Sequence, residues 1–209
     1  MLHTATALDD LIDEQFGPRL EAEGFHRVRS RRWVRAAKAP IREVVHVGSA
    51  KHGAHSSRWG LSFDFVPHEL ALHPEWHKTN ATALRDLRID PIDWSDESLA
   101  KVYRFAGDDP STRSVASAAK ATVESANQWF DRVSNVASTL PLFEEARNDS
   151  ESRFGFDHYP QQRLAHAFVL AHTGQTSRGF AELAIWLDTL TRTLPTASKV
   201  EFHDLLAAI

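Results

Sequence analysis

The stretch that decides the fold runs from Trp59 to Val66 and reads Trp-Gly-Leu-Ser-Phe-Asp-Phe-Val. Large apolar side chains alternate along it with small or polar ones, and this period of two indicates a strand with one apolar face. Such a strand needs neighbouring strands and a covering layer on its apolar side. We therefore expect a sheet built around residues 59–66, with amphipathic helices packed against it.

The composition is that of a globular protein. The chain has 209 residues, of which 42% are hydrophobic and 25% are charged. No apolar run approaches the roughly 18 residues of a membrane span. The N-terminal residues lack a basic segment followed by an apolar one, so we expect no signal peptide and a cytoplasmic protein. The absence of Cys excludes thiol catalysis, disulfides and cysteine-ligated metal centres.

The part before the central strand predicts a helix followed by an antiparallel meander. Apolar residues recur at spacings of three and four over residues 6–23, although Pro18 predicts a kink or a break in that helix. Gly24 can take the left-handed conformation that ends a helix. Alternation then predicts one strand over residues 25–35 and another over 41–47, with connections too short for parallel crossovers.

The part after the central strand is mainly helical. Residues 68–100 show no clear period, so we expect loops and short elements there, while residues 101–106 alternate again and predict a fourth strand. A long helix is predicted from Pro110 to Pro141 as the cover of the sheet. Two further helices joined at Gly174 predict a helical hairpin.

Together these patterns indicate an α+β fold. It consists of an antiparallel sheet meander flanked by an N-terminal helix and a long covering helix, with a C-terminal helical hairpin. We expect residues 1–140 to form the sheet domain and residues 141–209 to form the helical hairpin.

Three short segments resemble a known bacterial family. They are Leu20-Glu-Ala-Glu-Gly24-Phe25-His-Arg27, Arg32-Trp33-Val34-Arg35 and Trp129-Phe130-Asp131-Arg132. With the predicted helix and strands around them, they resemble the domain of unknown function 4304 family over about residues 5 to 140. The resemblance implies a small α+β fold in a bacterial protein with no established activity, and it carries no catalytic residues.

One predicted strand is strongly basic. No Asp or Glu occurs between Gly24 and Arg42, and a period of two puts four arginines on one face: Arg27, Arg29, Arg31 and Arg35. With Trp33 nearby, this basic strand over residues 27–42 could bind nucleic acid through phosphate contacts and stacking. A solvated strand face, or an edge kept basic against aggregation, explains the same residues.

Histidines and one aspartate raise an acid–base or metal-dependent hydrolase as another alternative. His46 and Asp64 are candidates for a cross-strand acid–base pair, although a structural hydrogen bond would use the same residues. His68, His73 and His77 are weak metal candidates, since they lack the His-Glu-x-x-His pattern and Pro74 interrupts them. We therefore expect no metal and no cofactor.

The absence of catalytic signatures favours a non-enzymatic protein. Residues 1–60 carry more Lys and Arg than Asp and Glu, and residues 61–110 carry the reverse, which suits binding of a charged partner. We expect a macromolecule-binding protein whose partner is another protein, with an immunity-type, toxin-neutralising role as one version by analogy with other small α+β proteins. The expected contact surface is the polar face of the sheet or the groove of the helical hairpin.

Overall fold

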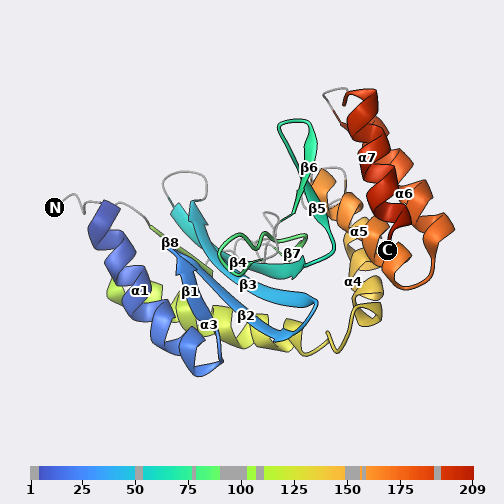
Figure 1. The fold of residues 1–209 in the computed structure, drawn as a ribbon. Coiled ribbons are helices and arrows are strands. Elements are labelled where there is room, and N and C mark those ends of the chain that lie inside the picture. The colour runs from blue at the N-terminus through green and yellow to red at the C-terminus, as the bar shows by residue number, and fades with distance from the viewer. Residues whose placement is uncertain are drawn as a thin grey trace. The chain divides into compact units, whose positions relative to one another are not determined.

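The computed structural model describes residues 5–49, 54–76, 79–89, 103–106, 111–148, 156, 159–190 and 194–209. Its main sheet has the strand order β1-β2-β3-β4-β7, with β8 also paired to β4 (Figure 1). The strands are β1 (His26–Arg29), β2 (Arg32–Lys38), β3 (Ile41–Ser49), β4 (Ala54–Phe63), β7 (Leu87–Ile89) and β8 (Arg104–Ala106). The β1–β2 and β4–β8 pairs are antiparallel, so the predicted α+β fold with an antiparallel sheet is confirmed.

The described residues also form a second, two-stranded sheet and several helices. The small sheet pairs β5 (Pro67–Leu70) with β6 (His73–Trp76). The helices are α1 (Ala5–Ala22), α3 (Thr112–Phe130), the 3₁₀-helix η2 (Ala137–Thr139), α4 (Leu140–Asn148), α5 (Pro160–His172), α6 (Thr176–Thr189) and α7 (Thr196–Ala207). The predicted helical hairpin is α5–α6, and Gly174 in its turn has a φ of 81°.

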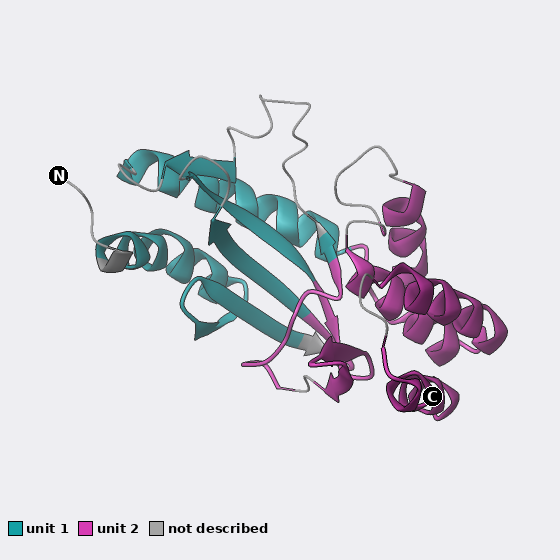
Figure 2. Cartoon of the chain, turned by 90° about the horizontal axis from the view of Figure 1, so that it is seen from above, with its two compact units in different colours: residues 1–37, 43–60, 88–131 teal, residues 38–42, 61–87, 132–209 magenta. Residues whose placement is uncertain are grey.

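The chain divides into two compact units (Figure 2). Unit 1 contains residues 1–37, 43–60 and 88–131, and unit 2 contains residues 38–42, 61–87 and 132–209. The boundary expected near residue 140 stays a prediction.

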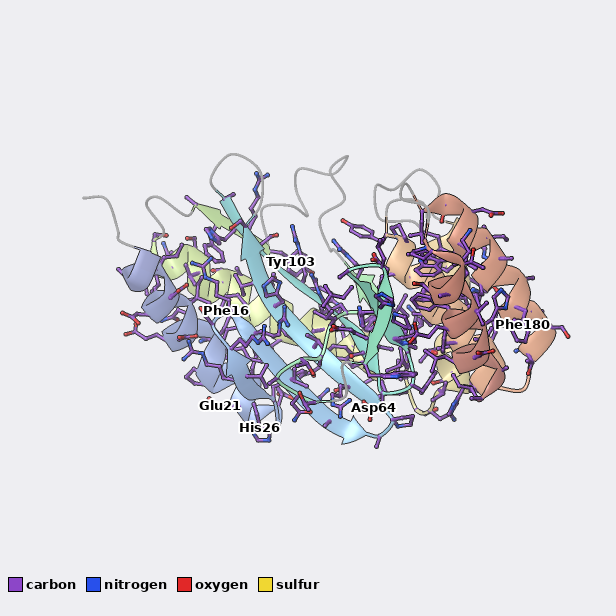
Figure 3. All side chains as sticks on the ribbon, turned by 45° about the horizontal axis from the view of Figure 1, so that its top comes forward. Phe16, Glu21, His26, Asp64, Tyr103 and Phe180 are labelled. Atoms are coloured by element: carbon purple, nitrogen blue, oxygen red, sulfur yellow. The ribbon has the colours of Figure 1, made fainter. Side chains whose placement is uncertain are left out.

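The core of unit 1 lies between the sheet and the helices α1 and α3. Trp33 of β2 stacks on Phe16 of α1, with ring centroids 6.0 Å apart and Trp33 fully buried. Figure 3 labels Phe16 on this helix. Ser57 of β4 shares a hydrogen bond of 2.5 Å with Thr122 of α3. Both helices therefore cover the face of the sheet that carries odd-numbered residues of β2 and β4.

Helix α1 ends where the sequence predicts, just before Gly24. Gly24 has a φ of 81°, and the Phe25 N–H donates to the Leu20 carbonyl over 3.0 Å, as in a Schellman motif. The predicted interruption at Pro18 is wrong in one respect, since the helix runs through that residue. Gly17 has no Cβ to clash with the proline ring, which removes one reason for a break.

The basic strand predicted over residues 27–42 is wrong. The chain reverses at Ser30 and Arg31, whose φ is 58°, so this range contains parts of β1 and β3 with β2 between them. Arg27 lies opposite Trp33 in the β1–β2 pair. The four arginines therefore do not share one strand face, because a period of two holds only within one strand.

The central strand and the long helix also differ from their predicted bounds. β4 ends at Phe63, and serines that alternate with its apolar residues are buried as well, since Ser56 is 0% exposed and Ser62 is 1% exposed. The polar side of this strand is thus no open binding surface. α3 starts after the N-cap Ser111 and stops at Phe130, whereas Pro141 lies in the first turn of α4, where a proline needs no donor.

Helices α5 and α6 approach each other closely at Gly179. A Cβ on this residue would lie only 2.7 Å from the carbonyl oxygen of Ala167 on α5. Gly179→Ala should lower the free energy of unfolding by about 1–3 kcal/mol, since two helix backbones must separate. Ser177→Ala, at an exposed position of the same helix, should change it by less than about 0.5 kcal/mol. Urea denaturation measures both, and equal effects would contradict the close approach.

Candidate functional site

Most of the arginines nominated from the sequence form ion pairs within unit 1. Arg27 pairs with Asp13 of α1 over 2.5 Å, and Arg31 pairs with Asp9 one helical turn away. Arg29 is exposed on β1. Two of the four charges thus fasten the first hairpin to α1, which reduces the positive potential available for a nucleic acid.

Arg35 is the most deeply integrated of these arginines. Its guanidinium pairs with Glu43, which is 1% exposed, and donates to the side-chain oxygen of Asn127 over 3.2 Å. It also lies 4.4 Å from the ring centroid of Phe25. Arg35 therefore joins β2, β3, α3 and the segment that follows α1, which is a structural role.

The nominated His46 and Asp64 lie in different units. His46 lies on β3 beside Gly48, since a Cβ on that glycine would be 3.1 Å from the imidazole Cε1. Asp64 of unit 2 forms an ion pair with Arg42, and the Nε of Arg42 donates to Asn80 over 2.8 Å. Burial lowers the pKa of Arg42 from its ordinary value. The acid–base pair of His46 and Asp64 stays a prediction.

The nominated metal candidates have separate surroundings. His68 is buried against Asp86, His73 is exposed and lies 3.6 Å from Glu201, and His77 lies outside the described residues. In the part of the chain that the structure describes, no group of three or more His, Cys, Asp or Glu could hold a metal ion.

Asp86 is the centre of a buried hydrogen-bond network in unit 2. Its side chain is 0% exposed, and it accepts the Phe63 backbone N–H over 2.7 Å. His68 Nε2 lies 2.8 Å from one carboxylate oxygen, and Gln161 Nε2 donates to the same oxygen over 3.2 Å. Because a buried carboxylate needs such partners, Asp86 fixes the end of β4, strand β5 and helix α5 relative to one another.

This network anchors the base of a hairpin made by β5 and β6. Gln161 also donates to the Pro67 carbonyl over 3.1 Å, at the first residue of β5. The strands pair Pro67 with Trp76 at the base and Leu70 with His73 at the tip. Figure 1 shows the hairpin next to α7, and the ion pair of His73 with Glu201 joins the two elements.

The turn of this hairpin has an unusual sequence for its shape. Ala71 has a φ of 50° and Leu72 a φ of 73°. A two-residue turn with positive φ at both positions normally contains Asn and Gly, and each non-glycine residue held there costs of order 1–3 kcal/mol. The Glu69 carboxylate accepts the Leu72 N–H over 2.8 Å and helps to hold the turn.

The hairpin exposes an apolar side chain at each end, Leu70 beside the turn and Trp76 at the base. Leu70 is 52% exposed and Trp76 is 39% exposed. Among the described residues the exposed large hydrophobic side chains all belong to unit 2, with Ile185, Val200 and Ile209 as the others. An apolar side chain on a fixed hairpin is the feature of this unit best suited to contact another molecule.

The hairpin lies in a stretch where we expected only loops and short elements. Ala-Leu is not a recognisable turn pair, and Pro67 and Pro74 argue against regular strands. Pro74 is tolerated because β6 pairs only with β5 among the described strands, so that it is an edge strand of a two-stranded sheet there.

A second buried histidine, His166 of α5, packs against α4. His166 is 0% exposed, stacks on Phe143 and lies 3.2 Å from Arg147 through Nδ1. Burial, with Arg147, Arg178 and Arg163 nearby, lowers the pKa of His166 to about 3. A neutral imidazole that accepts from Arg147 at Nδ1 carries its proton on Nε2, which lies 3.7 Å from Glu144.

The arginines around His166 are themselves paired. Arg147 and Arg163 both contact Glu182, which is largely buried, and Arg178 lies 3.3 Å from Glu144. These ion pairs join α4, α5 and α6.

Comparison of the chain with protein-family models, with curated proteins and with solved structures finds no match in any of the three. The resemblance to the domain of unknown function 4304 family therefore stays a prediction. Within the described residues, no helix has both the length and the apolar character needed to cross a membrane.

Asp86→Ala should lower the free energy of unfolding by about 3 kcal/mol, because it leaves buried donors on Phe63, His68 and Gln161 without their acceptor. Asp188→Ala, an exposed change on α6, should have little effect. Urea denaturation compares the two variants, and a loss for Asp86→Ala no larger than that for Asp188→Ala would contradict the anchoring role.

His166 should make stability fall as the pH falls from about 6.5 towards 3, because the unfolded chain binds a proton that the folded histidine does not. The slope contributed is at most about 1.4 kcal/mol per pH unit. His166→Gln should make the free energy of unfolding less dependent on pH over this range. Denaturation curves at several pH values test this, and identical slopes would contradict it.

Proposed function

We propose that the protein is a non-enzymatic protein-binding module and that the β5–β6 hairpin is its contact element. The observation that carries the proposal is the exposed Leu70 at the tip of a hairpin whose base is fixed by Asp86. An apolar anchor held in place before binding loses little conformational freedom when a partner covers it. This is the general design of protein contact sites.

The strained turn supports the same proposal. Ala71 and Leu72 keep positive φ angles that their side chains disfavour. Strained backbone of this kind is found most often at binding and active sites, where the shape of the loop is needed for contact. The hairpin thus retains a costly conformation while presenting an apolar side chain to solvent.

An immunity-type role is one version of this proposal. A bacterial, cytoplasmic protein that neutralises a toxin would need a preformed contact surface of this kind. The version rests on analogy with other small α+β proteins and on no catalytic motif.

The alternatives have less support from the geometry. Nucleic-acid binding through residues 27–42 has to use arginines of which Arg27, Arg31 and Arg35 already have acidic partners. A hydrolase based on His68 has an Asp–His pair, but Asp86 also bonds to the Phe63 backbone and to Gln161, which suits a structural anchor.

Leu70→Asp should abolish binding of the partner without unfolding the protein, because Leu70 is exposed and a carboxylate cannot enter an apolar pocket. Ile185→Asp changes another exposed apolar residue, on α6, and should leave binding intact. The measurement is quantitative affinity capture from a lysate of the source organism, with unfolding curves to confirm that both variants fold. Capture of the same proteins in equal amounts by the Leu70→Asp variant would contradict the proposal.

A further inference from the structure

We infer that the partner of the β5–β6 hairpin presents a cationic protein surface around an apolar pocket. This inference rests on the proposed protein-binding role of the hairpin and names the chemistry of its partner.

The register of the hairpin puts an apolar and an acidic residue on one face. Leu70 lies opposite His73, and His68 lies opposite Glu75. Residues opposite each other, and residues two apart along a strand, share a face. Leu70, His73 and Glu75 are therefore on the same side of the hairpin. All three are exposed, whereas His68 on that side is buried at the base.

Helix α7 continues this face with a further carboxylate. His73 Nδ1 lies 3.6 Å from Glu201 Oε2, so the same side of the hairpin is turned towards α7. Glu201 is half exposed, and its neighbour Val200 is 51% exposed. We call Leu70, His73, Glu75 and Glu201 the hairpin patch.

The formal charge of these elements is mainly negative. Residues 67–76 and α7 together contain Glu69, Glu75, Glu201 and Asp204, with Lys199 as the one Lys or Arg. Contact surfaces combine an apolar centre with a charged rim, and opposite charges on the partner speed association and exclude wrong partners. Leu70 supplies the apolar centre of the hairpin patch, and Glu75 and Glu201 supply its acidic rim.

This charge also selects among classes of macromolecule. Nucleic acids and anionic membrane surfaces carry negative charge and are repelled by an acidic rim. A protein surface with Lys or Arg around a pocket that accepts a leucine is complementary to both parts of the hairpin patch.

A phage-displayed random peptide library tests the inference with a defined probe. The library is panned against the wild-type chain and counter-selected against the Leu70→Asp variant. Peptides that require Leu70 should be enriched in Lys and Arg together with apolar residues. Their affinity should fall about fivefold at low salt for Glu75→Lys or Glu201→Lys, and the difference should shrink at high salt.

Glu124→Lys on α3 is the matched control, because it reverses an exposed carboxylate in unit 1 and should leave peptide affinity unchanged. Peptides that require Leu70 but lack cations, or that bind the Glu75→Lys and Glu201→Lys variants as tightly as the wild type, would overturn the cationic partner and leave the hairpin as the contact element. Failure to select any peptide that requires Leu70 would count against both proposals. Thermal unfolding confirms that every variant is folded.

Discussion

The buried carboxylate of Asp86 is the constraint on which unit 2 depends. A carboxylate with no solvent exposure is tolerated only when donors surround it, and here they come from the Phe63 backbone, His68 and Gln161. These donors lie on β4, β5 and α5. Removing any of these elements would leave a charge or a donor unsatisfied, so the end of the central strand, the small sheet and the helical hairpin fix one another.

The β5–β6 hairpin is fixed at its base and exposed at its tip, and the two features are connected. Because Asp86 and Gln161 hold the start of β5, the turn at Ala71 and Leu72 can remain in a strained shape without the hairpin coming apart. The arginines of unit 1 differ from the exposed residues of the hairpin, because most of them have partners within the unit. Arg35, for example, contacts Glu43, Asn127 and Phe25. The basic residues that stand out in the sequence therefore mostly form structural ion pairs, whereas the hairpin that we propose as the contact element lies in a stretch without a clear sequence pattern.

Local patterns predicted what depends on local interactions. The end of α1 at Gly24 and the pairing of α5 with α6 follow from residues close together in the chain. The reversal at Ser30 and Arg31 lacked a glycine signal, and the burial of Ser57 depends on Thr122 in a distant helix. The hairpin patch was missed for both reasons, because its turn is Ala-Leu and its anchor joins Asp86 to Gln161. Of the nominated residues, His68 and His73 belong to the hairpin.

The two ion pairs between α1 and the first hairpin have a consequence for the order of assembly. Arg31 and Asp9 are separated by 22 residues, whereas Gln161 and Asp86 are separated by 75. Closing a short loop costs less entropy than closing a long one. The N-terminal helix and its hairpin can therefore form while the ribosome is still making the rest of the chain, but the β5–β6 hairpin gains its anchor only after α5 has emerged.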